Sequence, residues 1–320
     1  MHAVAVSDLH GNLRLYELLL RIAETWRISS VFIAGDLGPP GGLRSIDPAG
    51  AAEIITRQRD FYRRELIPLM ESFFHGHRHT HVYAILGNDD CAANEELLLQ
   101  FDRDCANFHL VNGRVVPLRE SHQMHSMFPD EIPLLHVAGY PFVPPGAGLL
   151  MDWVKFENRL ELRPPDIDPC ADLSTSGLRT AGDGEPSTTI ADDLADFRKF
   201  LDSPSEEPVD YAPERTIHLF HSPPYNTPLD WVPPAGRYEF LSLPDHVGSI
   251  EIRRFIERTQ PYLVLSGHCH ESVVLGDYKT TIGTTVCVNP GSQTHLDVLS
   301  LVQFDVYRPS RMKQFFIHAD

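Results

Sequence analysis

The chain has 320 residues and a formal net charge of −17, because 44 acidic side chains outnumber 27 basic ones. Its hydrophobic content of 42% and charged content of 22% are typical of a globular protein and exclude wholesale disorder. The acidic balance argues against broad contact with nucleic acid or with an anionic membrane surface, since both require many lysines and arginines. We therefore expect neither of these partners.

Five short apolar runs are typical of buried β-strands, and each ends at polar residues that can bind a metal. In chain order, the runs are Ala3–Ser7, Val31–Ala34, His81–Leu86, Thr216–Phe220 and Tyr262–Leu265. The spacing of apolar residues between these runs predicts helices. They are Leu13–Trp26, Ala51–Phe74, Asn94–Phe101 and Ile250–Arg258, the last with Ser249 as its N-cap. Strands that alternate with helices predict an α/β sheet.

Two segments interrupt this alternation. Residues Phe108–Leu118 contain two strand-like runs around Asn112-Gly113, a pattern that predicts a β-hairpin. Residues 163–213 are rich in Pro, Asp, Ser and Thr and predict a surface insertion with a short helix near Ile190–Leu201. We predict a single domain over residues 1–320 that contains this insertion.

The cellular location is predicted from the chain start and the cysteines. The first residues lack the charged leader, apolar run and cleavage site of a secretory signal. The five cysteines, an odd number without a C-x-x-C pair, are typical of reduced thiols. No apolar run approaches the roughly 18 residues of a membrane span. We therefore expect a cytoplasmic protein.

The metal-capable side chains follow the predicted strands, where ligands of open α/β sheets bind. Seven such residues come from five segments: Asp8, His10, Asp36, Asn88, His221, His268 and His270. This donor set suffices for two divalent ions, and one carboxylate can bridge both. Mixed oxygen and nitrogen donors are compatible with Mn, Fe or Zn. A single Gly-Asp or Gly-His dipeptide usually marks a turn, so the prediction depends on the ordered series.

The series resembles, in order, the five motifs of the calcineurin-like metallophosphoesterases. The matching segments are Asp8-Leu9-His10, Gly35-Asp36, Gly87-Asn88-Asp89-Asp90, His221 and Gly267-His268-Cys269-His270. A closer resemblance is to the branch of predicted phosphoesterases related to cyclic-nucleotide phosphodiesterases. It is carried by residues 221–230, Gly248-Ser249, residues 267–271 and residues 289–292.

The resemblance implies a four-layer αββα sandwich of two mixed sheets flanked by helices. It implies that one metal is held by Asp8, His10, Asp36 and His270, and the other by Asp36, Asn88, His221 and His268. Asp36 would bridge the two ions. A water or hydroxide between them would attack phosphorus in line. The chain would then be a metal-dependent phosphoric ester hydrolase acting on a small phosphoester.

The third motif departs from the family pattern, because Asp89 replaces a histidine that is often assigned as a general acid. An unperturbed carboxylic acid titrates near 3.9, against about 6.5 for imidazole, and two nearby cations would lower the pKa of Asp89 further. We therefore expect a poor proton donor unless Asp89 is strongly buried. A fixed carboxylate repels a dianionic monoester more than a monoanionic diester. We predict catalytic roles for Asp89 and Asn88 and a phosphodiester, or an activated ester, as substrate.

Several alternatives stay open at this point. Asp89 can instead hydrogen-bond a neighbouring loop. Asn12 can bind the substrate phosphate, or it can cap the helix that follows. The alternative functions are a phosphomonoesterase, a catalytically weak or regulatory metal-binding relative of the same fold, and a nucleic-acid-processing enzyme, which the net acidity disfavours. The oligomeric state is not readable from the sequence.

Overall fold

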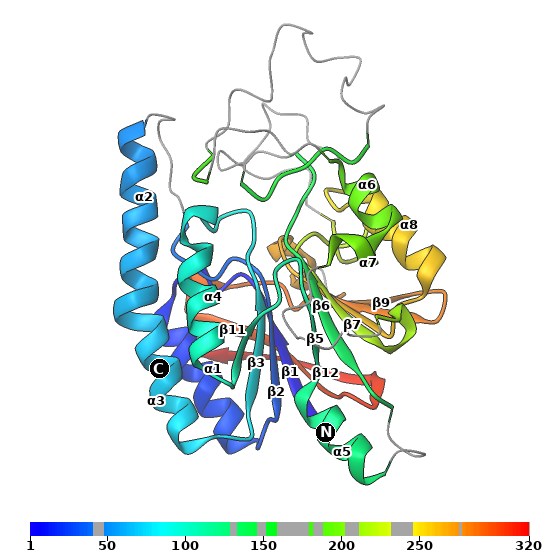
Figure 1. The fold of residues 1–320 in the computed structure, drawn as a ribbon, viewed down its shortest axis with the longest axis horizontal. Helices are drawn as coiled ribbons and strands as arrows, with labels where there is room; N and C mark the ends of the chain where they lie inside the picture. Colours follow the sequence, from blue (N-terminus) through cyan, green and yellow to red (C-terminus); the bar gives the residue numbers. More distant parts are fainter. Residues whose placement is uncertain are drawn as a thin grey trace, which may run out of the picture.

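Two six-stranded sheets pack against each other between two groups of helices (Figure 1). This computed structural model describes residues 1–40, 48–128, 133–145, 152–158, 179–181, 188–201, 211–231, 246–274 and 277–319. The helices α1–α4 cover the outer face of one sheet, and α6–α8 cover the outer face of the other (Figure 1). The arrangement confirms the predicted αββα sandwich.

The first sheet has the strand order β12-β11-β1-β2-β3-β4. Its strands are β1 (His2–Val6), β2 (Ser30–Ala34), β3 (His81–Ile85), β4 (Phe108–Leu110), β11 (Val298–Asp305) and β12 (Arg308–His318). Strands β1–β4 are parallel, whereas β11 runs antiparallel to both of its neighbours, β1 and β12. All of the predicted strands in this part of the chain are present, within one or two residues at their ends.

The second sheet has the strand order β5-β6-β7-β8-β10-β9. Its strands are β5 (Val115–Pro117), β6 (His136–Tyr140), β7 (Thr216–Phe220), β8 (Leu263–Ser266), β9 (Lys279–Ile282) and β10 (Thr285–Val288). The four central strands are parallel, and β5 and β9 run antiparallel at the edges. The carboxyl ends of β1, β2, β3, β7 and β8 define what we call the carboxyl edge, and the opposite ends define the amino edge.

The predicted helices are present, and α5 is a further helix that the sequence analysis did not predict. They are α1 (Leu13–Thr25), α2 (Pro48–Phe61), α3 (Ile67–Gly76), α4 (Glu95–Asp104), α5 (Arg119–Met127), α6 (Ile190–Ala195), α7 (Phe197–Phe200) and α8 (Ile250–Thr259). A π-helical turn, Tyr62–Leu66, joins α2 to α3. Pro68 in the first turn of α3 has no N–H to donate to the carbonyl of Arg64, which accounts for the wider turn just before it.

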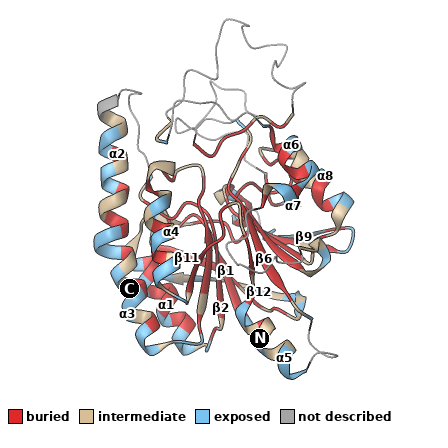
Figure 2. Ribbon diagram, viewed as in Figure 1, coloured by how far each residue is buried: buried red, intermediate tan, exposed pale blue. Residues whose placement is uncertain are grey.

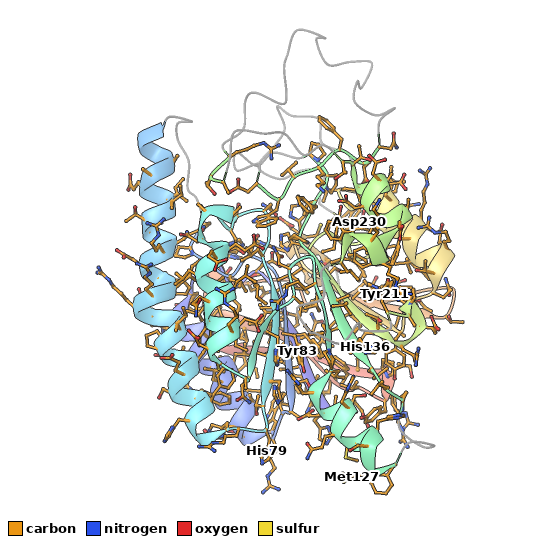
Figure 3. The ribbon with its side chains drawn as sticks, viewed as in Figure 1. His79, Tyr83, Met127, His136, Tyr211 and Asp230 are labelled. Carbon is orange, nitrogen blue, oxygen red and sulfur yellow. The ribbon has the colours of Figure 1, made fainter. Side chains whose placement is uncertain are left out.

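The buried residues form three apolar layers, as expected for two sheets and two helical layers (Figure 2). Alternation along β1 shows how the sequence achieves this, because Val4 and Val6 pack against helices while Ala3 and Ala5 face the second sheet. Strands buried on both faces read as continuous apolar runs. Strand β3 begins at the amino edge, near His79, which points out from the molecule in Figure 3.

The predicted hairpin around Asn112-Gly113 is wrong. Strand β4 pairs with β3 at the edge of the first sheet, and β5 pairs with β6 at the edge of the second. Gly113, with φ of 61°, forms a corner between the two sheets. The Asn112 side chain accepts a hydrogen bond from the Leu86 N–H (3.1 Å) and donates to Glu95 (2.8 Å). The turn signal is real, but the backbone groups of each run are paired elsewhere.

Most of the predicted insertion at 163–213 lies outside the described residues. Its described part includes α6 and α7, which fall at the predicted short helix. Just before the insertion, Lys155 pairs with Asp193 of α6 (2.6 Å). Glu157 accepts hydrogen bonds from Ser249 and from the first backbone N–H groups of α8. The beginning of the insertion is thus tied to the helices over the second sheet. None of the described helices is both long and apolar enough to cross a membrane.

Candidate metal centre

The predicted ligands come together at the carboxyl edge, from loops of both sheets. In the first sheet β1, β2 and β3 are parallel neighbours, so the loops after them lie side by side. In the second sheet β7 and β8 are parallel neighbours in the same way. The His221 Nδ1 atom, from the loop after β7, lies 2.8 Å from the carbonyl oxygen of Ala34 at the end of β2. This contact joins the two sets of loops across the sandwich.

The backbone at these strand ends is unusual. Four predicted ligands have left-handed conformations: Asp8 (φ 54°), His10 (46°), Asp36 (53°) and His268 (66°). Non-glycine residues seldom adopt positive φ, although Asp and His do so more often than most, and such conformations cluster at functional sites. Each costs on the order of 1 kcal/mol or more, which the surrounding hydrogen bonds must offset.

Two glycines explain how closely the loops approach. A Cβ atom on Gly35 would lie 2.2 Å from His221 Nδ1, and one on Gly87 would lie 2.4 Å from Asp36 Oδ1. Any side chain at either position would therefore push a predicted ligand out of place. The Gly-Asp and Gly-Asn pairs of the second and third motifs are steric requirements of the site as well as turn signals.

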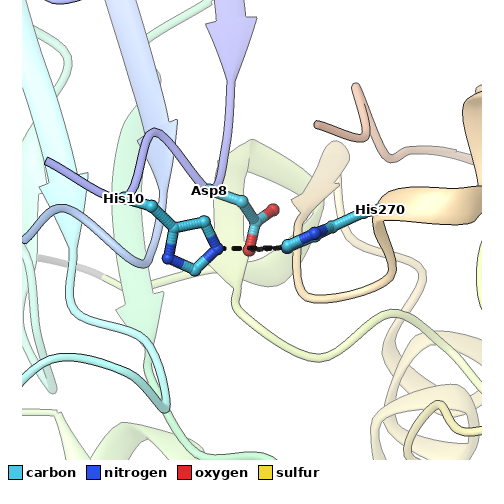
Figure 4. Close-up of side chains that lie close together, drawn as sticks. All are labelled: Asp8, His10 and His270. Carbon is cyan, nitrogen blue, oxygen red and sulfur yellow. Dashed lines mark hydrogen bonds and ion pairs between the residues drawn. The ribbon is translucent and has the colours of Figure 1, made fainter. Parts of the chain in front are cut away.

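One group of donors consists of Asp8, His10 and His270 (Figure 4). The Nε2 atoms of His10 and His270 lie 3.2 Å apart, and His270 Nε2 lies 3.4 Å from Asp8 Oδ1. Asp8 is fully buried, and its carboxylate also accepts the backbone N–H of His268 at 3.1 Å.

A second group of donors surrounds the Asn88 side-chain oxygen. This oxygen lies 2.9 Å from His221 Nε2 and 2.6 Å from His268 Nδ1. The Asp36 Oδ2 atom lies 3.4 Å from His221 Nε2 and 3.9 Å from His10 Nε2. Asp36 therefore stands between the two groups, the position that a bridging ligand requires.

The donor set fits two metal ions. Nitrogen and oxygen atoms converge on each other within 4.8 Å in three overlapping groups, all built from Asp8, His10, Asp36, Asp89, His221 and His270. Among the described residues, no lysine or arginine forms an ion pair with Asp8 or Asp36, so only histidines face these buried carboxylates. Imidazole nitrogens and carboxylate oxygens that point at one another in this way are the ligands of Mn, Fe and Zn sites.

The pKa shifts have one physical cause, the burial of acids and bases together. Burial alone would raise the pKa of Asp8 and Asp36, but the positive charges of His270 and His221 hold both pKa values below the ordinary range. Burial alone would lower the pKa of those histidines, but the carboxylates raise the pKa of His221 to about 10 and of His270 to about 9. Histidinium–carboxylate pairs thus balance the charge, and metal binding would release the histidine protons.

Sequence reasoning missed the role of Asp90. Its buried carboxylate accepts hydrogen bonds from the backbone N–H groups of Leu37 (3.0 Å), Gly38 (2.8 Å) and Gly87 (2.9 Å) and from the Tyr62 hydroxyl (2.9 Å). These contacts hold the loop of Asp36 against the loop of Asn88. Burial and the charge of Asp36 raise the pKa of Asp90 to about 6. The signal was its place in the third motif, but only the fold shows which N–H groups it meets.

The third motif is also supported by residues just before the insertion. The Trp153 indole N–H donates to the backbone oxygen of Asp90 at 2.9 Å. Asp152 accepts the backbone N–H of Ala92 at 2.9 Å and that of Thr180 at 2.7 Å. Nothing in the local sequence pattern predicts these contacts, since Asp152 and Ala92 are 60 residues apart.

Asp89 occupies the rim of the centre, with its side chain 32% exposed. Burial by the surrounding chain, together with the charges of Asp36 and Asp90, raises its pKa to about 7. Burial of this carboxyl was the condition under which we expected Asp89 to keep its proton more readily. Two bound cations would oppose this shift.

Asn12 is occupied by structural contacts. Its side-chain oxygen caps α1 by accepting the backbone N–H of Leu15, and its amide donates to Asp297 at 2.8 Å. Both ends of the side chain are thus used within the fold. The geometry favours the capping role of Asn12, and its predicted contact with substrate stays a prediction.

A buried carboxylate and histidine cluster at the edge of an αββα sandwich defines the class of dinuclear metallohydrolases. The profile of the calcineurin-like phosphoesterases matches residues 1–272, and the chain belongs to this family. Members of the family bind two divalent metal ions, and the Asp/His groups described above can hold them. No curated protein sequence matches the chain.

Solved structures share the fold at low sequence identity. TT1561 of Thermus thermophilus aligns with 15% identity and a TM-score of 0.53, over 100% of this chain and 99% of that one. A second solved structure aligns with 14% identity and a TM-score of 0.59, over 100% and 99%. At these identities the likeness is one of fold alone.

Proposed function

We propose that the chain is a dinuclear metal-dependent phosphodiesterase that hydrolyses a small phosphodiester or an activated phosphoester. The observation that carries the proposal is the position of Asp36, whose Oδ2 atom lies 3.4 Å from His221 and 3.9 Å from His10. A carboxylate shared by two groups of histidine donors is what a two-metal hydrolase needs. Membership of the calcineurin-like phosphoesterases supports the hydrolase class.

The residues divide the work as follows. Asp8, His10 and His270 would hold one ion, Asn88, His221 and His268 would hold the other, and Asp36 would be shared. Two divalent ions at this position would polarise the phosphoryl group and make water nucleophilic near neutral pH. Asp90 keeps the second and third motif loops in register. The donor set is compatible with Mn, Fe and Zn, and availability in the cell would decide among them.

Asp89 supports a diester over a monoester. Its carboxylate is partly exposed at the rim and lies 3.7 Å from His10, so an entering phosphate passes close to it. With the metals bound, Asp89 is ionised, and it repels a second negative charge on the substrate. A diester carries one negative charge near neutral pH, whereas a monoester carries nearly two. The acidic balance of the whole chain does not oppose such a substrate, since two divalent ions make the site locally cationic.

The test is a paired assay of one aryl phosphodiester and the matching monoester with metal-reconstituted protein. The wild type should prefer the diester, and Asp89→His should shift the ratio toward the monoester. Asn88→Ala removes the side-chain oxygen that lies between His221 and His268, and it should abolish turnover of both substrates. Equal turnover by the wild type and Asn88→Ala would show that the proposed site is wrong. A monoester preference that Asp89→His leaves unchanged would contradict the diester proposal alone.

A further inference from the structure

The two nitrogens of His10 have different surroundings. Its Nε2 atom faces the predicted metal pocket, 3.2 Å from His270 Nε2 and 3.9 Å from Asp36 Oδ2. Its Nδ1 atom is buried on the other side of the ring and has no hydrogen-bond partner among the described residues. The Asp89 Oδ2 atom lies 3.7 Å from this nitrogen. A buried nitrogen without a hydrogen-bond partner is costly, and the carboxylate of Asp89 is an acceptor close enough to relieve that cost.

The backbone of Asp89 is held on both sides, which aims its side chain. Its N–H donates to Asp36 Oδ1 at 2.8 Å, and its carbonyl oxygen accepts from the Gln58 amide at 2.6 Å. Of its two carboxylate oxygens, Oδ1 accepts from the Asn88 amide at 3.2 Å. The other oxygen, Oδ2, is directed at His10. The backbone of Asp89, the residue that departs from the family pattern, is thus held beside the Nδ1 atom of His10.

We propose that Asp89 is a positioning residue that accepts a hydrogen bond from the Nδ1–H of His10 and thereby directs the His10 Nε2 lone pair at the metal. Histidines that bind a metal almost always donate their other N–H to a carboxylate, a carbonyl or water, which fixes the tautomer and makes the ligand more basic. The present 3.7 Å exceeds a hydrogen bond by about one ångström, a gap that rotation of a partly exposed aspartate can close. A histidine at position 89 could not supply this negative charge.

The inference rests on the proposed metal centre and adds a role for Asp89 in binding the metal itself. It therefore predicts an effect on metal affinity that is separate from substrate preference. The matched control is Glu271→Gln, which removes one charge within electrostatic range of His270 but touches neither His10 nor Asp89 in the described contacts. Loss of charge alone would affect both variants, whereas loss of the His10 partner affects only Asp89 variants.

The experiment is calorimetric titration of Mn²⁺ into metal-stripped wild type, Asp89→Ala, Asp89→Asn and Glu271→Gln. Asp89→Ala should lower the affinity for Mn²⁺ about 10- to 100-fold, the usual effect of removing such a partner, with two ions still bound. Asp89→Asn, which keeps an oxygen acceptor, should lose less, and Glu271→Gln should stay close to the wild type. Thermal unfolding without metal checks that each variant folds. If Asp89→Ala does not fold, the test is made with Asp89→Asn.

Nitrogen NMR of histidine-labelled, Zn²⁺-loaded protein gives a second readout. The wild type should show a hydrogen-bonded Nδ1–H, assigned to His10 by its loss in His10→Asn, and this signal should change in Asp89→Ala only. A wild type that fails to bind two ions would overturn both the metal centre and this inference. A wild type that binds two ions while Asp89→Ala binds Mn²⁺ as tightly as Glu271→Gln would overturn the positioning role alone. Loss of one whole ion with an unchanged His10 signal would also overturn it, and would make Asp89 a direct ligand.

Discussion

Each edge of the sandwich carries a close pair of histidines, and of these two pairs the one at the carboxyl edge lies against buried carboxylates that bind no lysine or arginine among the described residues. At the amino edge His81 Nδ1 lies 3.1 Å from His109 Nε2, almost the separation of His10 and His270 at the carboxyl edge. His81 also stacks on His109, with ring centroids 5.4 Å apart. The distance between the two histidines therefore does not distinguish the carboxyl edge from the amino edge.

The carboxylates make the difference. At the amino edge Asp102 lies 3.7 Å from His109 and is already bound by Arg114. Burial there lowers the pKa of His81 to about 4, and the pKa of His109 shifts in the same direction. At the carboxyl edge, Asp8 raises the pKa of His270 to about 9 against the effect of burial, whereas burial lowers the pKa of His10. A histidine pair reads as a metal site when unclaimed carboxylates face it, and as core packing when they do not.

The contrast between the two edges would be contradicted most clearly if a residue of the amino edge were necessary for catalysis. Asp36→Asn weakens the one donor shared by both groups, so we expect kcat/KM for the diester to fall at least about 10³-fold and metal content to drop. His81→Asn should leave activity within about threefold and metal content unchanged. Metal analysis and a model diester assay on both variants give the result. A loss of metal from His81→Asn would show that the amino edge contributes to the site.

The second prediction concerns the loops that hold the ligands. Asp90→Ala would leave four buried donors without an acceptor, each costing about 1–3 kcal/mol, although relief of repulsion with Asp36 offsets part of this. We expect a loss of roughly 3 kcal/mol in the free energy of unfolding, measured by urea denaturation. Asp90→Asn keeps one acceptor oxygen and should cost less. Wild-type stability in Asp90→Ala would mean that the loops are held by other contacts.

His81 at the amino edge and His221 at the carboxyl edge should respond to pH with opposite sign. The folded pKa of His81, about 4, lies below its ordinary value of 6.5, so its contribution to stability is full above pH 6.5 and is lost between pH 6.5 and 4. The folded pKa of His221, about 10, lies above 6.5, so its contribution is full below pH 6.5 and is lost as pH rises through 10. Each slope is at most about 1.4 kcal/mol per pH unit, and smaller for the partly exposed His81.

Urea unfolding in EDTA, from about pH 4.5 to 10, measures this difference. The stability of the wild type minus that of His81→Gln should fall toward acid pH, and the wild type minus His221→Gln should fall toward alkaline pH. Using differences cancels the contributions of Asp89 and Asp90 in the His81 comparison. In the His221 comparison the difference also contains the change in the pKa of Asp89, which the charge of His221 lowers. Equal slopes for the two variants would contradict the contrast between the edges.

The smallest expected effect concerns Asn12, at the boundary of the metal centre. Asn12→Ala removes the N-cap of α1 and the hydrogen bond to Asp297, so we expect a loss of about 1 kcal/mol in stability. The KM for the diester should change by less than about threefold if capping is the whole role. A large increase in KM with unchanged stability would instead support the predicted contact of Asn12 with substrate.

Much of the fold was readable because its signals are local. Each of the five predicted strands is a short apolar run, each long helix has apolar residues on one face, and Ser249 caps α8 by accepting the Ile252 N–H as predicted. The Asn112-Gly113 signal misled because a turn pattern says nothing of which sheet each run joins. Pairing with β3 and β6 decided that question.

The sequence by itself determined which residues are offered to the metal centre and in what order, since a motif records residue type and spacing. Only the tertiary structure decided how they meet, because Asn88 and His268 are separated by 180 positions and His10 and His270 by 260. The tertiary structure also decided that Asp90 faces inward and joins the loops of Asp36 and Asn88 by hydrogen bonds, while its neighbour Asp89 faces His10. The physical reason is that hydrogen-bond partners and burial are set by chain segments far away in the sequence, and no local pattern records them.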